Sequence, residues 1–136
     1  MLQMTIASTV DLVNVVRATV HHAVKATGAL SGRRLEDIRL ATSEAVTNAI
    51  QANHARDPSQ PVEIACELRD GLVRLAVTDY GYGIEHADTL PNISDPERLH
   101  TEGGFGLPLL HTLTGDRVEF ALNDPGTTVT IWMAQQ

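Results

Sequence analysis

The sequence contains one cysteine, Cys66, among its 136 residues. A lone cysteine rules out an internal disulfide and is typical of a reducing compartment, so we expect a cytoplasmic protein. Cys66 lies within an alternating apolar pattern, which favours a buried thiol over a nucleophile. The 6 histidines are scattered and form no ligand pattern with each other or with this cysteine, so the sequence predicts no zinc site.

Basic residues and long apolar runs are also scarce. Lys and Arg number 10 against 17 Asp and Glu, which gives a formal net charge of −7 at pH 7. Nucleic acid needs a basic face and is not expected as a partner. A nucleotide is compatible with this charge, because a few amides and a metal ion can hold it. No apolar run approaches the ~18 residues of a membrane span, and residues 1–9 lack the regions of a signal peptide, so no membrane association is expected.

The remaining composition, 43% hydrophobic and 20% charged residues, is that of one globular domain over residues 1–136. Apolar residues at three- and four-residue steps predict two helices before residue 60. The first follows a Ser-Thr cap at 8–9 and ends at Gly28, and the second opens at Gly32 and frays near Asn53. Their apolar stripes are Leu12, Val13, Val16, Val20 and Val24 in the first helix, and Leu35, Ile38, Ala41, Ala45 and Ala49 in the second.

Period-two alternation predicts five strands, of which two form a β-hairpin around Asp70-Gly71. The alternation after this turn places Asp79 on the apolar face of its strand. A carboxylate on a buried strand face is costly without a partner, so Asp79 is a candidate site residue. The expected strands are residues 2–7, 62–68, 73–77, 118–122 and 127–133.

Glu44 and Asn48 stand four residues apart in the second helix, which places both on one face, one turn apart. A carboxylate and a carboxamide beside an apolar seam suit a site that handles a metal ion and a proton. The alternative is a solvated helix face, and a short motif alone does not decide between the two.

Two glycine motifs follow. The stretch DYGYG at 79–83 has two glycines that permit positive φ and a close approach of another group to the backbone. Residues 91–102 are polar and have no period, so we expect a mobile lid. The cluster from Gly103 to Leu107 leads into a helix at Pro108, which suits a phosphate cradle, with a simple hinge as the alternative.

Together these motifs resemble the GHKL ATPases, a family that includes gyrase, heat-shock chaperones, histidine kinases and mismatch-repair proteins. SEAVTNAI at 43–50 is similar to the N box, DYGYG to the DxGxG box, GGFGL at 103–107 to the lid box, and GTT at 126–128 to the final element near the adenine. The resemblance covers nearly the whole chain and is greatest to the RsbW/SpoIIAB-type anti-sigma factors. It implies an α+β fold: a two-layer α/β sandwich of the Bergerat type, with a mixed, mostly antiparallel sheet and helices on one face.

The resemblance also implies roles, with ATP and Mg²⁺ as cofactors. Glu44 would be the general base toward a serine hydroxyl, and Asn48 would be a magnesium ligand through its amide oxygen. Asp79 would accept a hydrogen bond from the adenine amine, while Gly81 and Gly83 would leave room for the nucleotide. The other implied contacts are the lid residues Gly103, Gly104, Phe105, Gly106 and Leu107 at the phosphates, and Thr128 at the adenine.

The implied partners are a sigma factor, a STAS-domain anti-anti-sigma protein whose serine is phosphorylated, and a second copy of the chain in a homodimer. Arg17 matches an arginine of the first helix with which family members grip the sigma factor. With His21 and Lys25 it forms a basic stripe at four-residue steps, for which a solvated face is the alternative.

Two positions depart from the family pattern. Ala52 stands where many members have a histidine, and Glu102 precedes the lid glycines where a basic residue is common. Both departures concern the rate of phosphoryl transfer more than nucleotide binding. One alternative is therefore an ATP-binding partner-switching module with little or no kinase activity. A separate alternative is the catalytic domain of a histidine kinase, although the chain has no helical hairpin with a phosphoacceptor histidine.

Overall fold

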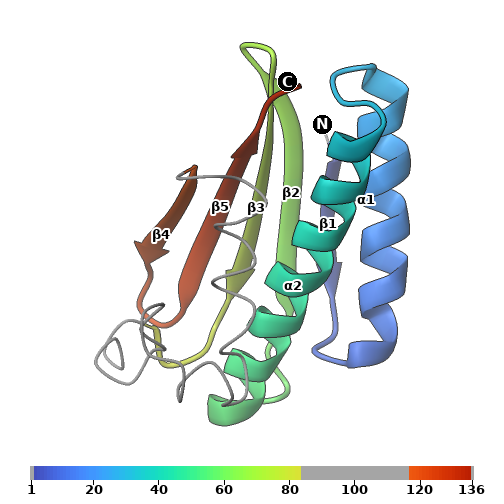
Figure 1. The fold of residues 1–136 in the computed structure, drawn as a ribbon. Coiled ribbons are helices and arrows are strands. Elements are labelled where there is room, and N and C mark those ends of the chain that lie inside the picture. The colour runs from blue at the N-terminus through green and yellow to red at the C-terminus, as the bar shows by residue number, and fades with distance from the viewer. Residues whose placement is uncertain (1, 84–116, 136) are drawn as a thin grey trace, which may run out of the picture.

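The computed structural model describes residues 2–83 and 117–135 of the chain (Figure 1). Within these ranges, the helices α1 and α2 pack on one face of a five-stranded sheet, as Figure 1 shows. This confirms the two-layer α+β sandwich expected from the sequence. The elements are β1 (Leu2–Ile6), a one-turn 3-10 helix η1 (Val10–Leu12), α1 (Val13–Thr27), α2 (Arg33–Arg56), β2 (Val62–Arg69), β3 (Leu72–Asp79), β4 (Val118–Leu122) and β5 (Thr127–Met133).

The sheet has the strand order β1-β2-β3-β5-β4. Every pairing among these described strands is antiparallel, so this part of the sheet is more regular than the mixed sheet that we expect from the resemblance. Tight turns join β2 to β3 and β4 to β5, and a tight turn can connect only antiparallel neighbours. The register between β3 and β5 pairs Asp79 with Thr127 and Thr78 with Thr128.

The two helices bury the faces that their spacing predicts. Val16, Val20 and Val24 of α1 are all buried against the sheet and α2. The helix ends at Gly28, whose φ of 73° is a left-handed C-cap that glycine adopts without strain. Neither α1 nor α2, the helices of the described ranges, is long and apolar enough to cross a membrane.

The start of α1 and the end of α2 differ from the prediction. Thr9 is the N-cap of η1, but its side chain makes no capping bond. Ser8 does not cap a helix either, because its Oγ donates to the carbonyl of Gln60 at 2.6 Å. The second helix continues to Arg56 and does not fray near Asn53, since Asn53 is fully buried and hydrogen-bonded.

The core lies between the helices and the sheet and includes Leu75 and Ile131, which are both fully buried. Burying such a side chain contributes about 1.5–3 kcal/mol relative to leaving it exposed. Cys66 belongs to this core, as expected. Its burial raises the pKa of the thiol to about 11, so the thiol is protonated at neutral pH and is a poor nucleophile.

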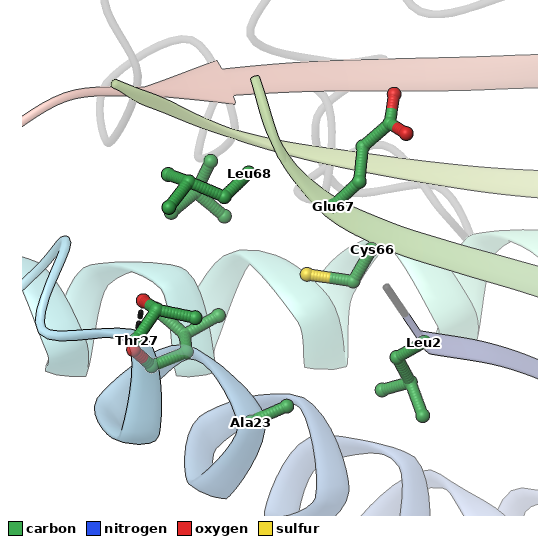
Figure 2. A pocket seen from close by; sticks show the side chains of 8 residues that line it. Leu2, Ala23, Thr27, Cys66, Glu67 and Leu68 are labelled. Carbon is green, nitrogen blue, oxygen red and sulfur yellow. Dashed lines mark hydrogen bonds between the residues drawn. The ribbon is translucent and has the colours of Figure 1, made fainter. Parts of the chain in front are cut away.

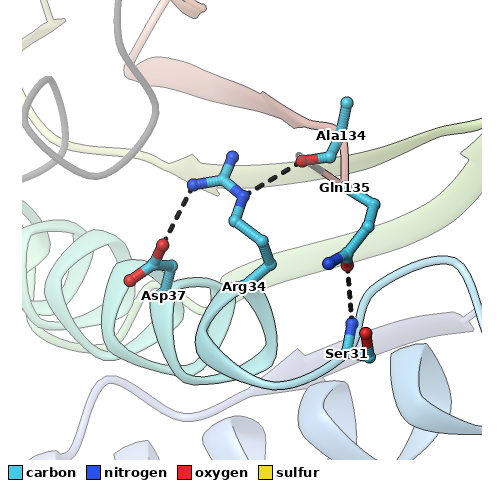
Figure 3. A network of polar contacts seen from close by, with 5 residues as sticks. All are labelled: Ser31, Arg34, Asp37, Ala134 and Gln135. Carbon is cyan, nitrogen blue, oxygen red and sulfur yellow. Dashed lines mark hydrogen bonds and ion pairs between the residues drawn. The ribbon is translucent and has the colours of Figure 1, made fainter.

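The C-terminal end of β5 is tied to the first turn of α2 (Figure 3). Arg34 donates from Nε to the carbonyl of Ala134 at 3.0 Å and pairs through Nη1 with Asp37 at 2.9 Å. The amide of Ser31 donates to Oε1 of Gln135 at 2.7 Å. These bonds hold α2, which carries the candidate site residues, in a set position over the sheet.

We expect Arg34→Ala to lower the free energy of unfolding by about 1.5–3 kcal/mol, the usual scale for bonds to a charged group. The side chain of Arg34 is only 13% exposed, so water does not replace its partners fully. Its exposed neighbour provides the control, and Arg33→Ala should change stability by less than ~0.5 kcal/mol. Urea denaturation measures both free energies of unfolding. Equal effects of the two variants would show that the bonds of Arg34 to Ala134 and Asp37 do not stabilise the fold.

Candidate functional site

Glu44 and Asn48 lie one turn apart on α2, beside the buried Ala45 and Ala49. Both polar residues are half-buried. Within residues 2–83 and 117–135, neither side chain makes a hydrogen bond or an ion pair. The carboxylate of Glu44 and the amide oxygen of Asn48 are therefore both available to bind another group.

Asp79 ends β3 on the same face as Val77, as the alternation predicts, and the residue is 7% exposed. Burial raises the pKa of its carboxyl group, while hydrogen bonds from the backbone amides of Gly81 and Thr127 act in the opposite direction. The amide of Gly81 donates to Oδ1 at 2.9 Å. A carboxylate can accept about four hydrogen bonds, so it retains capacity for a further donor.

The loop that follows Asp79 lies directly against α2. A Cβ atom at Gly81 would be 2.7 Å from the carbonyl oxygen of Ala52, one turn beyond Asn48. A Cβ atom at Gly83, whose φ is +68°, would be 2.8 Å from the carbonyl oxygen of Gly126. Close packing against these carbonyl groups therefore favours glycine at both positions, whether or not a ligand binds. This packing brings the helix motif and the DYGYG stretch together.

Thr128 does not lie beside Asp79. Its Oγ1 is 2.9 Å from Oγ1 of Thr78 and accepts from Nδ2 of Asn123 at 3.0 Å. Neighbouring residues of a strand point to opposite faces, so Thr128 and Thr78 share the face that the helices do not cover. Thr127 is the residue paired with Asp79, and it shares the face of Asp79. The structure therefore favours Thr127 over Thr128 as the threonine of an adenine site.

Asn53 borders the candidate site, and the motifs do not include it. It is 0% exposed, and its Oδ1 accepts from the amide of Tyr80 at 2.7 Å, next to Asp79. The sequence does contain a signal for it, because Ala45, Ala49 and Asn53 follow one another at four-residue steps on the buried face.

The remaining predicted site residues are those of the lid box and Arg17. The expected lid at 91–102 falls outside the described residues, and so do the lid-box residues Gly103, Gly104, Phe105, Gly106 and Leu107. Arg17 is half-buried on α1, where Nη2 donates to Oδ1 of Asn14 at 2.6 Å. It is not in contact with the residues around Asp79, so any partner surface on α1 is separate from this site.

A small pocket of about 80 Å³ opens at the other end of the sheet (Figure 2). Its walls come from β1, the last turns of α1 and the hairpin of β2 and β3, whereas Asp79 is the last residue of β3. None of the motif residues lines this pocket. The lining residues are Leu2, Ala23, Val24, Thr27, Cys66, Glu67, Leu68 and Val73.

Comparison with known proteins assigns this arrangement to a family. Residues 6–133 match the family model described as "Histidine kinase-like ATPase domain". The chain therefore belongs to the family of histidine kinase-like ATPase domains, which confirms the resemblance to the GHKL proteins. Membership in this family implies the use of ATP.

Within that family the chain is similar to named bacterial regulators. It is 34% identical over 97 residues to an anti-sigma F factor of Geobacillus thermodenitrificans (strain NG80-2), covering 70% of this chain and 66% of the relative. It is 31% identical over 102 residues to the serine-protein kinase RsbW of Bacillus licheniformis, covering 71% and 62% respectively. The RsbW of Staphylococcus epidermidis is 24% identical over 136 residues, covering 96% and 84%. The chain thus spans slightly under two thirds of the length of the first two relatives.

Two solved structures share the fold. A chain in the crystal structure of the SiaB-SiaC complex from Pseudomonas aeruginosa superposes with a TM-score of 0.75 at 10% identity, covering 98% of this chain and 89% of that one. The histidine kinase domain of the blue-light activated histidine kinase EL346 from Erythrobacter litoralis gives a TM-score of 0.53 at 21% identity, covering 92% and 60%.

Proposed function

We propose that this protein is an anti-sigma factor and an ATP-dependent serine protein kinase, which sequesters a sigma factor and phosphorylates a serine of a STAS-domain anti-anti-sigma protein. The observation that carries the proposal is the packing of the Asp79 loop against the helix of Glu44 and Asn48. Under this proposal, Asp79 as the adenine acceptor and Glu44 and Asn48 as the proton and metal groups would lie on adjoining elements. The names of the relatives, anti-sigma F factor and RsbW, support the same function.

The donor set fits an adenine nucleotide with magnesium. Asp79 has acceptor capacity for the exocyclic amine of adenine on a face that is otherwise apolar. Asn48 offers a hard amide oxygen, which suits Mg²⁺, and makes no bond within the described parts of the chain. When bound, the ion would offset the charge that develops on the phosphates. We propose that residues 103–107, outside the described ranges, close over those phosphates.

Glu44 is the proposed general base. The serine hydroxyl of the partner would give its proton to the Glu44 carboxylate while the serine oxygen forms a bond to the γ-phosphorus of ATP. The bond between that phosphorus and the bridging oxygen would break, ADP would leave, and Glu44 would release the proton to water. Asn48, one turn further along α2, would orient the phosphates for this displacement.

The function is tested by incubating the protein and Mg-ATP with STAS-domain proteins from the same cell. We expect one of them to gain a single phosphate on a serine, detected by intact-mass spectrometry and peptide mapping. Nucleotide-dependent binding of a STAS protein without transfer would instead indicate a partner-switching module. Transfer to a histidine would indicate a histidine kinase domain.

We further propose that the sigma factor and a second copy of the chain bind on α1, around Arg17. Arg17, His21 and Lys25 line one side of this helix, while Val16, Val20 and Val24 face the core. In a protein of net charge −7, such a stripe suits an acidic patch on a partner.

We expect Arg17→Ala to weaken sigma-factor binding at least about tenfold, because truncating a buried interfacial charge costs ~2–5 kcal/mol. The affinity for ATP should not change, since Arg17 is remote from the Asp79 loop. Arg39→Ala, which removes an exposed arginine of α2 paired with Glu36, is the matched control. Calorimetric titration compares the variants, and parental affinity of the Arg17 variant for the sigma factor would remove α1 from the interface.

A further inference from the structure

Asn53 is a fully buried carboxamide in the last turn of α2. A buried polar side chain is tolerated only when its hydrogen-bonding groups are satisfied. Here Oδ1 accepts from the amide of Tyr80 at 2.7 Å. Nδ2 donates to Oγ of Ser8 at 2.8 Å and to the carbonyl of Pro61 at 3.0 Å, with the carbonyl of Gln60 at 3.3 Å.

These bonds join three connections that are far apart in the sequence. Ser8 follows β1, Gln60 and Pro61 precede β2, and Tyr80 follows β3. One side chain of α2 therefore braces three of the described connections at this end of the sheet against the helix.

The backbone of Tyr80 is held on both sides by the end of α2. Its amide donates to Asn53, and its carbonyl accepts from Nη1 of Arg56 at 2.9 Å. The next amide, that of Gly81, donates to the carboxylate of Asp79. The position of the Tyr80 peptide thus determines where the Gly81 amide points, and with it the orientation of the Asp79 carboxylate.

We infer that Asn53 is a positioning residue for adenine recognition. It does not touch the base; it holds the backbone between Asp79 and Gly81 so that the carboxylate faces the adenine amine. This inference rests on the proposed function, because it assumes that the Asp79 carboxylate accepts a hydrogen bond from the adenine amine. A purely structural residue would affect stability, whereas a positioning residue also affects the choice of base.

The test compares ATP with ITP, whose base has a carbonyl in place of the exocyclic amine. The parent should prefer ATP, because Asp79 accepts from the amine and repels a carbonyl oxygen. In Asn53→Ala we expect this preference to shrink about tenfold or more, since a small misplacement of a polar group is enough to remove its discrimination. Calorimetric titration with each nucleotide gives the ratio of the two affinities.

Thr42→Ala is the control for lost stability. Thr42 is also fully buried on α2, but its hydroxyl donates to the carbonyl of Ile38 within the same helix at 2.7 Å. This variant should keep the parental preference for ATP even where its melting temperature falls as far as that of Asn53→Ala. Asn53→Asp is a second variant: it retains an acceptor for the Tyr80 amide but loses the donors, so its preference should lie nearer to that of the parent.

Amide hydrogen exchange in the parent provides a measurement that needs no variant. The Tyr80 amide should be protected, although it lies outside the strands, and should exchange far more slowly than the amide of the exposed Gly71. Rapid exchange of Tyr80, or an unchanged ATP preference in Asn53→Ala, overturns the inference and leaves the proposed function standing. A parent that binds neither nucleotide overturns both.

Discussion

Replacing Glu44 with glutamine is expected to lower phosphoryl transfer by about a hundredfold or more, the usual scale for a general base. Glutamine keeps the size of the side chain and its place on α2, so the neighbouring core residues are undisturbed. It cannot accept the serine proton. Because Glu44 is not assigned a contact with adenine, the affinity for Mg-ATP should stay close to that of the parent.

Transfer rates under single-turnover conditions, measured beside nucleotide titrations, separate these two effects. Glu36→Gln is the matched control, since Glu36 lies on the same helix but is exposed and paired with Arg39. It should leave both quantities unchanged. Parental transfer by the Glu44 variant would show that another group takes the proton.

Replacing Asp79 with asparagine is expected to weaken ATP and ADP alike by about tenfold to a hundredfold, the scale of a lost hydrogen bond to a charged group. An amide nitrogen turned toward the adenine amine would set one donor against another. The exposed turn residue Asp70 provides the same chemical change at the other end of β3, so Asp70→Asn should bind both nucleotides as the parent does.

The Asp79→Asn variant is also expected to be at least as stable as the parent at neutral pH. Burial raises the pKa of Asp79 above its ordinary value of 3.8, so the folded state holds the proton more tightly than the unfolded chain does. Such a group favours folding at pH below 3.8, and this contribution disappears as the pH rises through the folded pKa. Asparagine does not ionise, so the stability of Asp79→Asn relative to the parent should increase over that pH range.

Thermal denaturation of both proteins across the acid-to-neutral range, without nucleotide, tests this expectation. A variant that loses nucleotide and keeps its stability would separate the function of Asp79 from its part in the fold. A large loss of stability at neutral pH would instead show that the carboxylate supports the fold.

The local patterns of the sequence predict most of the fold. The hairpin around Asp70-Gly71 and the buried valines of α1 follow from periodicities of two and about 3.6 residues, which depend only on near neighbours. The burial of Asp79 follows from the same alternation. These features are predictable because each element must bury its own apolar face.

Contacts between distant segments were not predictable in this way. Alternation with Ile131 and Met133 puts Thr127 on the apolar face of its strand. Its place directly opposite Asp79, however, depends on the register of β3 against β5, which the alternation within either strand does not determine. The role of Asn53 depends on connections that reach it from separate parts of the chain. For the same reason the sequence predicts Ser8 as a helix cap, although its hydroxyl donates a hydrogen bond to the carbonyl of Gln60 instead.

The most direct test of the account is a nuclear magnetic resonance titration of the isotope-labelled protein with Mg-ATP. The account predicts that the largest amide shift changes among the described residues occur at 79–83 and around Asn48 on α2. The amides of Leu68 and Val73, beside the small pocket at the opposite end of the sheet, should barely change. Shift changes that gather at that pocket and spare residues 79–83, or no saturable change at all, would contradict the assignment of the nucleotide site.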